Sequence, residues 1–228
     1  MKSRIKSVTV IILVAAVIFF GAACSGNNDI NGFMAEYTIG DTGPCGGIIF
    51  YVADGLENRP LGFIVDGYGS EGDSGFFKTY TAHYLEVAPQ DSGASEWGDG
   101  LSIPNTTYIF DSIDSDAKKI GNGRKDTMLI VAHLNDISVS GIAAKLCTSE
   151  SIGGKNDWFL PSLGELDKLY KLYENKGKNN YANLKSLFYW SSSQQDSNRA
   201  WALHFGTGNP NMPTKHNYTN YVRAVRAF

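Results

Sequence analysis

The apolar run Val8–Phe20 constrains this chain most, because it decides which residues are left to fold. It follows the basic residues Lys2, Arg4 and Lys6 and ends at the small residues 21–23. A basic start, an apolar middle and a small-residue end are the order of an export signal. The run is also shorter than the ~20 apolar residues that a membrane-spanning helix needs. We therefore predict that this segment is removed and that the remaining chain works outside the cytoplasm.

Cys24 directly follows the small residues, and this context resembles the lipobox of bacterial lipoproteins, with Gly21 where leucine is usual. The resemblance implies that residues 1–23 are a lipoprotein signal peptide and that Cys24 carries the lipid. The membrane is then a partner through the lipid anchor, and the protein lies in the cell envelope, at the outer membrane or the cell surface. A plain secreted protein with an incidental Cys24 is the alternative. Residues 24–42 are polar and without periodicity, which predicts a flexible tether.

Residues 43–228 are long enough to form one domain with a substantial core. The chain carries 20 basic and 23 acidic residues, so its net charge of −3 gives no electrostatic reason to expect a nucleic acid partner. Only 19% of the residues are charged while 12% are aromatic, a composition that suits an extracellular recognition domain.

Two more cysteines, Cys45 and Cys147, lie inside the predicted domain. In an oxidising compartment they can form a single disulfide, and the alternative is two small buried thiols. The sequence leaves both open, because a disulfide requires Cα atoms within ~7 Å of each other.

Short apolar runs predict strands at the start of the domain. Ile48–Val52 follows a glycine-rich turn and predicts a buried strand, with Phe63–Val65 as its hairpin partner. Residues 66–77 are mostly Gly, Ser and Asp, which predicts a long surface loop. Tyr84–Ala88 is the next strand candidate.

Two further strands are predicted near the C-terminus. Large apolar residues alternate over Trp201–Phe205, as in a strand that buries one face. Residues 221–228 end on an apolar side chain, which predicts a central strand able to pair with the first one.

Two helices are predicted in the middle of the domain. Ile130, Leu134 and Ile137 share one face of the first, which resumes at residues 142–147 after a break.

The second helix has the stronger signal. Ser162 and Glu165 form a capping box, in which each side chain hydrogen-bonds the backbone amide of the other. Apolar residues then share one face from Leu163 to about Asn175, before Gly177 stops the helix.

Three segments, Asp157–Ser162, Tyr189–Ser193 and Val222–Arg226, carry a resemblance to a family of bacterial surface domains. That family also supplies the C-terminal domain of collagen-like bacterial adhesins, and its architecture is similar to C-type lectins and formylglycine-generating enzymes. The glycine-rich start, residues 40–51, is similar to the start of these domains in lipoproteins. The resemblance implies an α+β, C-type-lectin-like fold: a small, twisted, mainly antiparallel sheet with two flanking helices and long ordered loops.

The aromatic residues of these segments are interpreted as core side chains and not as a ligand platform, because large rings alternating with small residues usually fill a core. Arg226 is expected to pair with a buried carboxylate, either Asp157 or Glu165.

No metal, cofactor or enzymatic activity is predicted. The four histidines lack metal-ligand spacing. Asn209-Pro210-Asn211 resembles the Glu-Pro-Asn tripeptide of calcium-dependent lectins, but an amide replaces the carboxylate that calcium requires. The oxidising enzymes of similar fold use a late cysteine pair, and the chain after Trp190 has no cysteine.

The late loops, Gln194–Arg199 and Gly206–Asn220, remain as the candidate ligand site, because the corresponding loop binds ligands in the lectin-like folds that the chain resembles. Their polar and aromatic side chains suit adaptable recognition. An ordinary solvent-facing connection is the alternative. The predicted ligand-binding residues are Gln195, Asn198, Arg199, Asn209, Asn211, Lys215, His216, Asn217 and Tyr218.

Two functions follow as hypotheses. The first is a non-enzymatic binding or adhesion module whose late loops contact a host or matrix glycan or a protein. The collagen-like relatives suggest sulfated polysaccharides, but this chain has few clustered cations. The alternative is an envelope structural protein that associates with other exported proteins and has no external ligand.

Overall fold

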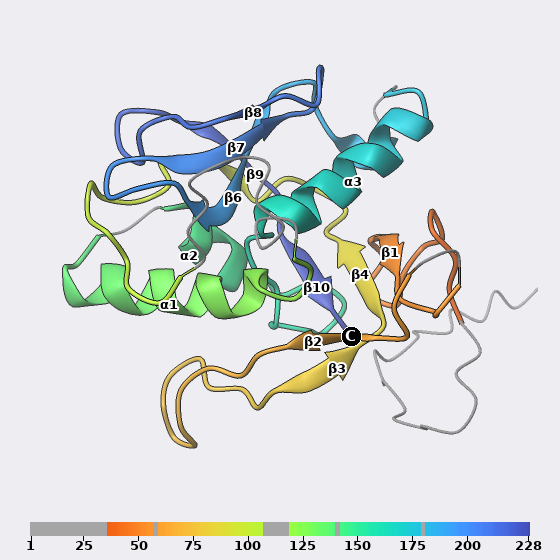
Figure 1. The fold of residues 1–228 in the computed structure, drawn as a ribbon, viewed down its shortest axis with the longest axis horizontal. Coiled ribbons are helices and arrows are strands. Elements are labelled where there is room, and N and C mark those ends of the chain that lie inside the picture. Colours follow the sequence, from red (N-terminus) through yellow and green to blue (C-terminus); the bar gives the residue numbers. More distant parts are fainter. Residues whose placement is uncertain (1–35, 57–58, 107–118, 140–141, 179–180) are drawn as a thin grey trace, which may run out of the picture.

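The computed structural model describes residues 36–56, 59–106, 119–139, 142–178 and 181–228. These residues form an α+β fold of three α-helices and small, mainly antiparallel sheets, as predicted (Figure 1). The predicted signal peptide, Cys24 and most of the tether lie outside the described residues. Within the described residues, no helix has the length and apolar character needed to cross a membrane.

One sheet joins the two ends of the domain. Its order is β1 (Ile48–Val52), β4 (Tyr84–Val87) and β10 (Val225–Ala227), and both pairings are antiparallel. The strands predicted at 48–52 and 84–88 are confirmed. The C-terminal strand is an edge strand and does not pair with β1, because the fully buried β4 lies between them.

The C-terminus is nevertheless well packed. Phe159 and Val225 exchange two backbone hydrogen bonds of 2.9 Å on the outer side of β10. Phe228 stacks on Tyr84, with 5.2 Å between the ring centroids.

The predicted hairpin between residues 48–52 and 63–65 is wrong. β2 (Phe63–Val65) pairs with β3 (Tyr80–Ala82) as a separate two-stranded sheet. The chain turns at a bridge between Asp54 and Leu61 and then runs outward. Residues 63–82, which we call the arm, project beside α1 (Figure 1).

A five-stranded sheet carries the candidate site. Its strands are β5 (Gly93–Ser95), β6 (Phe188–Gln194), β7 (Ala200–His204), β8 (Pro210–Asn211) and β9 (Asn220–Val222). Their order is β5-β9-β6-β7-β8, and only the β6–β9 pairing is parallel.

The helix predicted at 163–175 is confirmed as α3 (Leu163–Asn175). Its capping box is present: Glu165 N donates to Ser162 Oγ at 3.2 Å, and Ser162 N donates to Glu165 Oε2 at 2.8 Å. Glu165 is fully buried, and this desolvation raises the pKa of its carboxyl.

The first predicted helix is two helices, α1 (Gly123–Asp136) and α2 (Ala143–Thr148). The positive φ of 60° at Ser138 turns the chain after α1. Ala143 N then donates to Glu96 O, so α2 starts in a new direction. Three helices therefore stand where the sequence predicted two.

Strands β6 and β7 separate two core clusters. Trp201 and Leu203 pack on the α3 side, whereas Ala200, Ala202 and Trp190 pack on the α1 side. The sequence predicted that this strand buries one face. In the structure β7 buries both faces, because helices cover the sheet from both sides. The interpretation of the aromatic segments as core is confirmed.

The structure also places Arg226 and the two cysteines of the domain. Arg226 Nε donates to Asp157 Oδ1 at 2.6 Å, which confirms one of the two proposed partners. Cys45 and Cys147 are both buried and are not bonded to each other in this structure, and a disulfide between them in an oxidising compartment stays a prediction. Burial raises the pKa of the Cys147 thiol well above its ordinary value.

Candidate functional site

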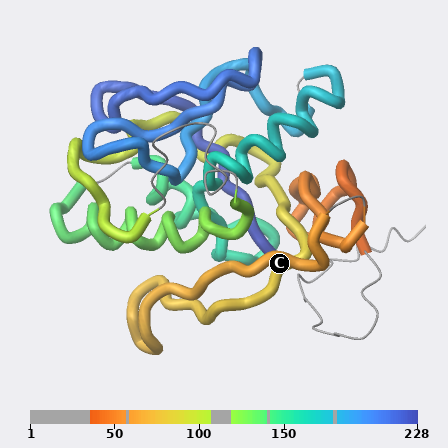
Figure 2. Tube along the Cα trace, in the orientation of Figure 1, coloured from red at the N-terminus to blue at the C-terminus, as the bar shows by residue number. Residues whose placement is uncertain are grey.

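Three segments converge at one end of the five-stranded sheet: residues 96–101, 195–199 and 213–219, which we call the late-loop face. Figure 2 shows the yellow-green segment around residue 100 running beside the blue C-terminal loops. Backbone hydrogen bonds hold them together, from Trp97 N to Lys215 O at 2.9 Å and from Lys215 N to Asn198 O at 2.8 Å. The first segment was not part of the predicted site.

Lys215 does not face solvent, contrary to its place among the predicted ligand-binding residues. Its side chain is 0% exposed, and Nζ donates to Leu101 O at 2.8 Å and to Gln194 Oε1. The ammonium also lies 4.8 Å from the centre of the Trp97 ring. The Lys215 side chain therefore ties residues 96–101 to the end of β6 from inside the fold.

Burial lowers the pKa of Lys215 to about 8, while the nearby carboxylates of Asp99 and Asp196 oppose that shift. Desolvation of the ammonium thus outweighs the favourable charges around it.

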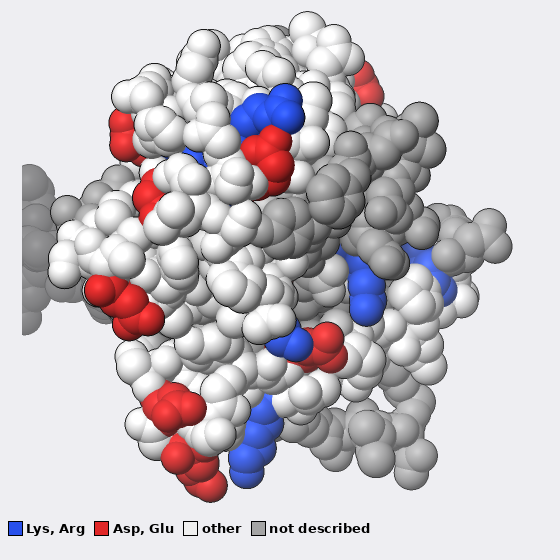
Figure 3. Space-filling model, turned by 60° about the vertical axis from the view of Figure 1, so that its left-hand side comes forward, with Lys and Arg blue, Asp and Glu red and all other residues white. Residues whose placement is uncertain are grey.

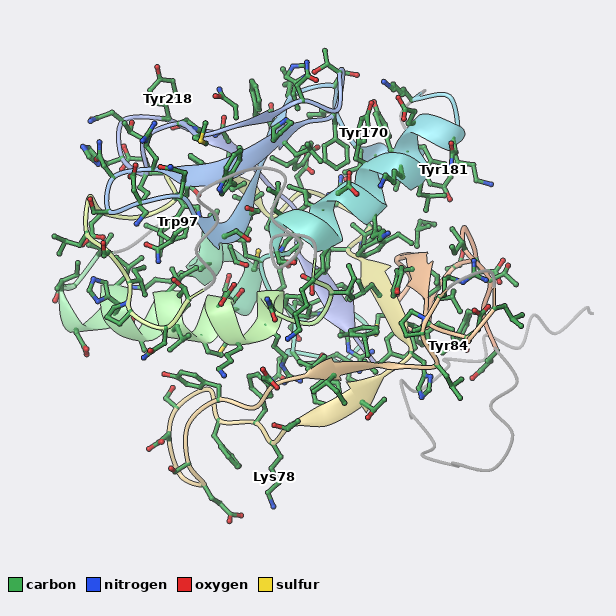
Figure 4. All side chains as sticks on the ribbon, in the orientation of Figure 1. Lys78, Tyr84, Trp97, Tyr170, Tyr181 and Tyr218 are labelled. Carbon is green, nitrogen blue, oxygen red and sulfur yellow. The ribbon has the colours of Figure 1, made fainter. Side chains whose placement is uncertain are left out.

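Gln194 and Trp97 complete the internal network. Ile103 N donates to Gln194 Oε1 at 3.1 Å, and Gln194 Nε2 donates to Ile103 O at 2.9 Å. The Trp97 indole donates to Ser191 O at 2.7 Å. In Figure 4, Trp97 lies below the loops towards α1, whereas Tyr218 points outward from them. The exposed loops thus rest on a hydrogen-bonded base.

The turn at 195–199 is fixed by Asp196. Its Oδ1 accepts from the backbone amides of Asn198 and Arg199 at 2.8 Å each, and its Oδ2 accepts from Arg199 Nε at 2.8 Å. Burial raises the pKa of Asp196, but these hydrogen bonds outweigh it and the pKa is lowered. The Arg199 charge is therefore matched within its own turn.

Gly100, Asn198 and His216 meet on the face. A Cβ added at Gly100 would lie 3.4 Å from Asn198 Oδ1 and 3.2 Å from His216 Cε1. The glycine therefore lets the imidazole and the amide approach the same backbone. His216 Nδ1 and Gln195 Oε1 are buried and have no hydrogen-bond partner among the described residues.

Asn217 and Tyr218 form the outer part of the face. Asn217 has a φ of 67°, a left-handed conformation that asparagine tolerates well. Its backbone N–H donates to Glu96 Oε1 at 2.9 Å. Tyr218 follows with 57% of its side chain exposed, and Leu101 is 52% exposed. The face therefore combines an exposed aromatic ring and an exposed alkyl group with polar residues.

Asn209 and Asn211 do not belong to this face. Asn211, on β8, pairs with Ala202 on β7. Asn209 O accepts from His204 N at 3.0 Å, at the far end of β7. Both residues are exposed, but along the sheet edge. Lys215 lies beneath the face. The structure brings six of the nine predicted residues together at its surface: Gln195, Asn198, Arg199, His216, Asn217 and Tyr218.

Few charged groups stand on this side of the molecule. Figure 3 shows scattered acidic and basic groups on a mainly uncharged surface. Residues 93–106 and 194–220 contain three carboxylates, Glu96, Asp99 and Asp196, against the two cations Arg199 and Lys215. No cluster of His, Cys, Asp and Glu able to hold a metal occurs among the described residues.

A groove of about 670 Å³ lies elsewhere, between the arm, α1 and residues 148–158. The sequence indicated only a Gly- and Ser-rich loop here, and the aromatic residues at its end, Phe76 and Phe77, were the available signal.

Part of the chain is similar to a known protein family, and its fold is similar to that of a solved structure. Residues 125–226 match the family model described as the Lcl C-terminal domain. This match contains the three segments, between Asp157 and Arg226, that carried the resemblance to the C-terminal domain of collagen-like adhesins.

A crystal structure of a fimbrial protein from Bacteroides ovatus has a similar fold, with a TM-score of 0.51 and 16% sequence identity. The similarity covers 80% of this chain but only 44% of that protein. No match is found among curated protein sequences.

Proposed function

We propose that this protein is a non-enzymatic adhesion module that binds uncharged glycans with its late-loop face. The observation that carries the proposal is that Tyr218, Asn198 and Asn217 are all exposed on one set of loops, which Lys215 fixes from below. The match to a surface-domain family and the lectin-like architecture implied by the sequence support it.

The available groups suit sugar hydroxyls. A side-chain amide supplies one acceptor and two donors, and a hydroxyl can use either. No hydrogen bond joins the Asn198 or Asn217 side-chain amide to another described residue. An aromatic ring such as Tyr218 offers an apolar face to the C–H groups of a sugar ring.

The charges favour a neutral ligand over a sulfated one. Lys215 is buried, and Arg199 is held by Asp196 with 2.7 Å between Nη2 and Oδ2. A sulfate group would have to break that pair and approach Glu96 and Asp99. A neutral glycan meets neither cost.

The test is a glycan array probed with the purified protein at low and high salt, followed by affinity measurements on variants. Tyr218→Ala and Asn198→Ala are each expected to raise the Kd about tenfold, equivalent to ~1.4 kcal/mol. Two control variants should leave the Kd unchanged: Leu61→Ala, which removes an exposed side chain outside the late-loop face, and Asn209→Ala, at the sheet edge. Binding that is unaffected by Tyr218→Ala and Asn198→Ala would refute the proposed site.

The lipid anchor is a second part of the proposal. Cys24 supports it by its position after an apolar run and small residues. Cells fed a labelled fatty acid should label the wild-type protein and not the Cys24→Ser variant. Protease treatment of whole cells then tests display at the surface, because a protein facing the periplasm would be protected and could not act as an adhesin.

A further inference from the structure

The groove between the arm and α1 is separate from the late-loop face and is a built feature. The Arg124 guanidinium stacks on Phe77 at 4.1 Å and donates to the Tyr80 hydroxyl at 3.0 Å. Tyr68 and Phe77 exchange backbone hydrogen bonds of 3.0 and 3.2 Å across the arm. The arm is thus tied to α1.

Close packing also fixes the arm at Gly75. A Cβ at this position would lie 2.8 Å from Met128 Sδ, and the φ of 80° disfavours other residues.

The groove has a volume of about 670 Å³, which lies in the range of small-ligand sites and accommodates several side chains of a partner.

The lining of the groove combines carboxylates with aromatic rings. Asp73, Asp136 and Asp157 contribute acidic groups, and Arg124 is the one Lys or Arg among the lining residues. Asp157 is already paired with Arg226, whereas no ion pair engages Asp73 or Asp136 within the described residues. In the described part of the chain, Asp73 Oδ2 accepts only a backbone hydrogen bond, from Ser70 N at 2.7 Å, and Arg124 offsets one of these two charges, so the lining keeps a net negative charge.

Trp158 adds an independent observation. It lines the groove, is 1% exposed, and its indole Nε1–H has no hydrogen-bond acceptor among the described residues. A buried donor without an acceptor costs free energy, which an acceptor from outside can recover. A peptide carbonyl has the required chemistry.

We infer that this groove binds a basic segment of a partner polypeptide. A lysine or arginine side chain of the partner enters between Asp73 and Asp136, and the rings of Tyr68 and Phe76 flank its charge. A main-chain carbonyl of the same segment accepts from Trp158 as the groove adjusts around it.

The test uses the purified full chain and a short fluorescein-labelled oligolysine peptide, measured by fluorescence anisotropy, with a Gly-Ser peptide as neutral probe. Asp73→Asn/Asp136→Asn is expected to weaken oligolysine binding at least about tenfold. Asp66→Asn/Glu71→Gln changes the net charge equally and alters exposed carboxylates of the arm outside the groove. This control should bind as the wild type does.

A steric variant separates the groove from general attraction to an acidic protein. Ala132 lines the groove on α1, and Ala132→Trp fills it without changing any charge. We expect this variant to lose oligolysine binding while circular dichroism shows an unchanged fold. Three results would each overturn the inference. The Asp66→Asn/Glu71→Gln control could lose as much binding as the groove variant, Ala132→Trp could bind fully with the wild-type fold, or the wild type could fail to bind.

Discussion

Arg223 gives the sharpest test of how this domain is held together. Its side chain is 0% exposed and makes four hydrogen bonds. Nε donates to Asp91 Oδ1 at 2.8 Å, and Nη1 donates to Ala88 O at 2.7 Å. Nη1 and Nη2 also donate to Ala182 O and Asn183 O, each at 2.9 Å. One guanidinium thus joins the end of β9 to two distant turns.

Arg223→Met removes all four donors: the carbonyl oxygens of Ala88, Ala182 and Asn183 lose the guanidinium, while Asp91 keeps Tyr189 and Lys185 as partners. Breaking a buried ion pair by removing one partner costs about 3–5 kcal/mol. For a domain of this size, each kcal/mol lowers Tm by about 2–4 °C, so the expected fall is roughly 10 °C. Arg223→Lys keeps the charge but cannot reproduce the planar set of donors, and we expect a loss of about 2 kcal/mol.

The assay is urea denaturation followed by circular dichroism, with the midpoint and the slope m compared between variants. Arg226→Met is the matched comparison, because Arg226 has 9% side-chain exposure and its partner Asp157 has 23%. We expect its loss to be about 1–2 kcal/mol, since a partly solvated pair contributes less. A loss below about 1 kcal/mol for Arg223→Met, or an equal loss for both methionine variants, would refute this account.

Further outcomes are expected at three positions: Lys215, Ser162 and Gly121. Lys215 has a pKa of about 8 in the folded protein, against an ordinary value of 10.5. Between these two pH values the unfolded chain binds more protons than the folded one, so the free energy of unfolding rises with pH. Urea denaturation should show this rise for the wild type and not for Lys215→Met. Tryptophan fluorescence should also titrate near pH 8 in the wild type alone, because the ammonium lies against Trp97, and a titration that survives in Lys215→Met would contradict the assignment. Ser162→Ala removes the cap of α3 and should cost about 1 kcal/mol of unfolding free energy by urea denaturation, whereas Ser197→Ala on an exposed turn should cost almost nothing. Gly121→Ala should destabilise the protein by more than 1 kcal/mol. The φ of Gly121 is 107°, and an added Cβ would lie 2.1 Å from Ile64 O. A Tm equal to that of the wild type would be inconsistent with this contact.

Local patterns predicted the elements whose signals lie close together in the sequence. The capping box of Ser162 and Glu165 placed the start of α3, because the two residues that form it are three positions apart. The apolar run Ile48–Val52 likewise predicted β1. The predicted pairing of β1 with β2 was wrong, because the three residues of β2 carry no local signal for the strand with which they pair, and that strand is β3.

The candidate site was predicted in composition and only partly in geometry. The late loops were found because Asn, Gly and Pro mark them, and Tyr218 is exposed as a contact residue must be. The burial of Lys215 could not be predicted, because its acceptors Leu101 and Gln194 come from distant parts of the chain. The segment around Gly100 was missed for the same reason.

The sequence by itself determined the helix Leu163–Asn175 and its cap, because these depend on residue type and short spacing. The α+β class followed from the resemblance to a known family, and the partner of Arg226 was left as Asp157 or Glu165, because 69 residues separate Arg226 from Asp157. Only the tertiary structure decided that β4 lies at the centre of its sheet, that Arg223 is the more deeply buried arginine, and that the arm closes a groove against α1. These features depend on contacts between residues far apart in the chain, whose free energy is gained only after the chain has folded.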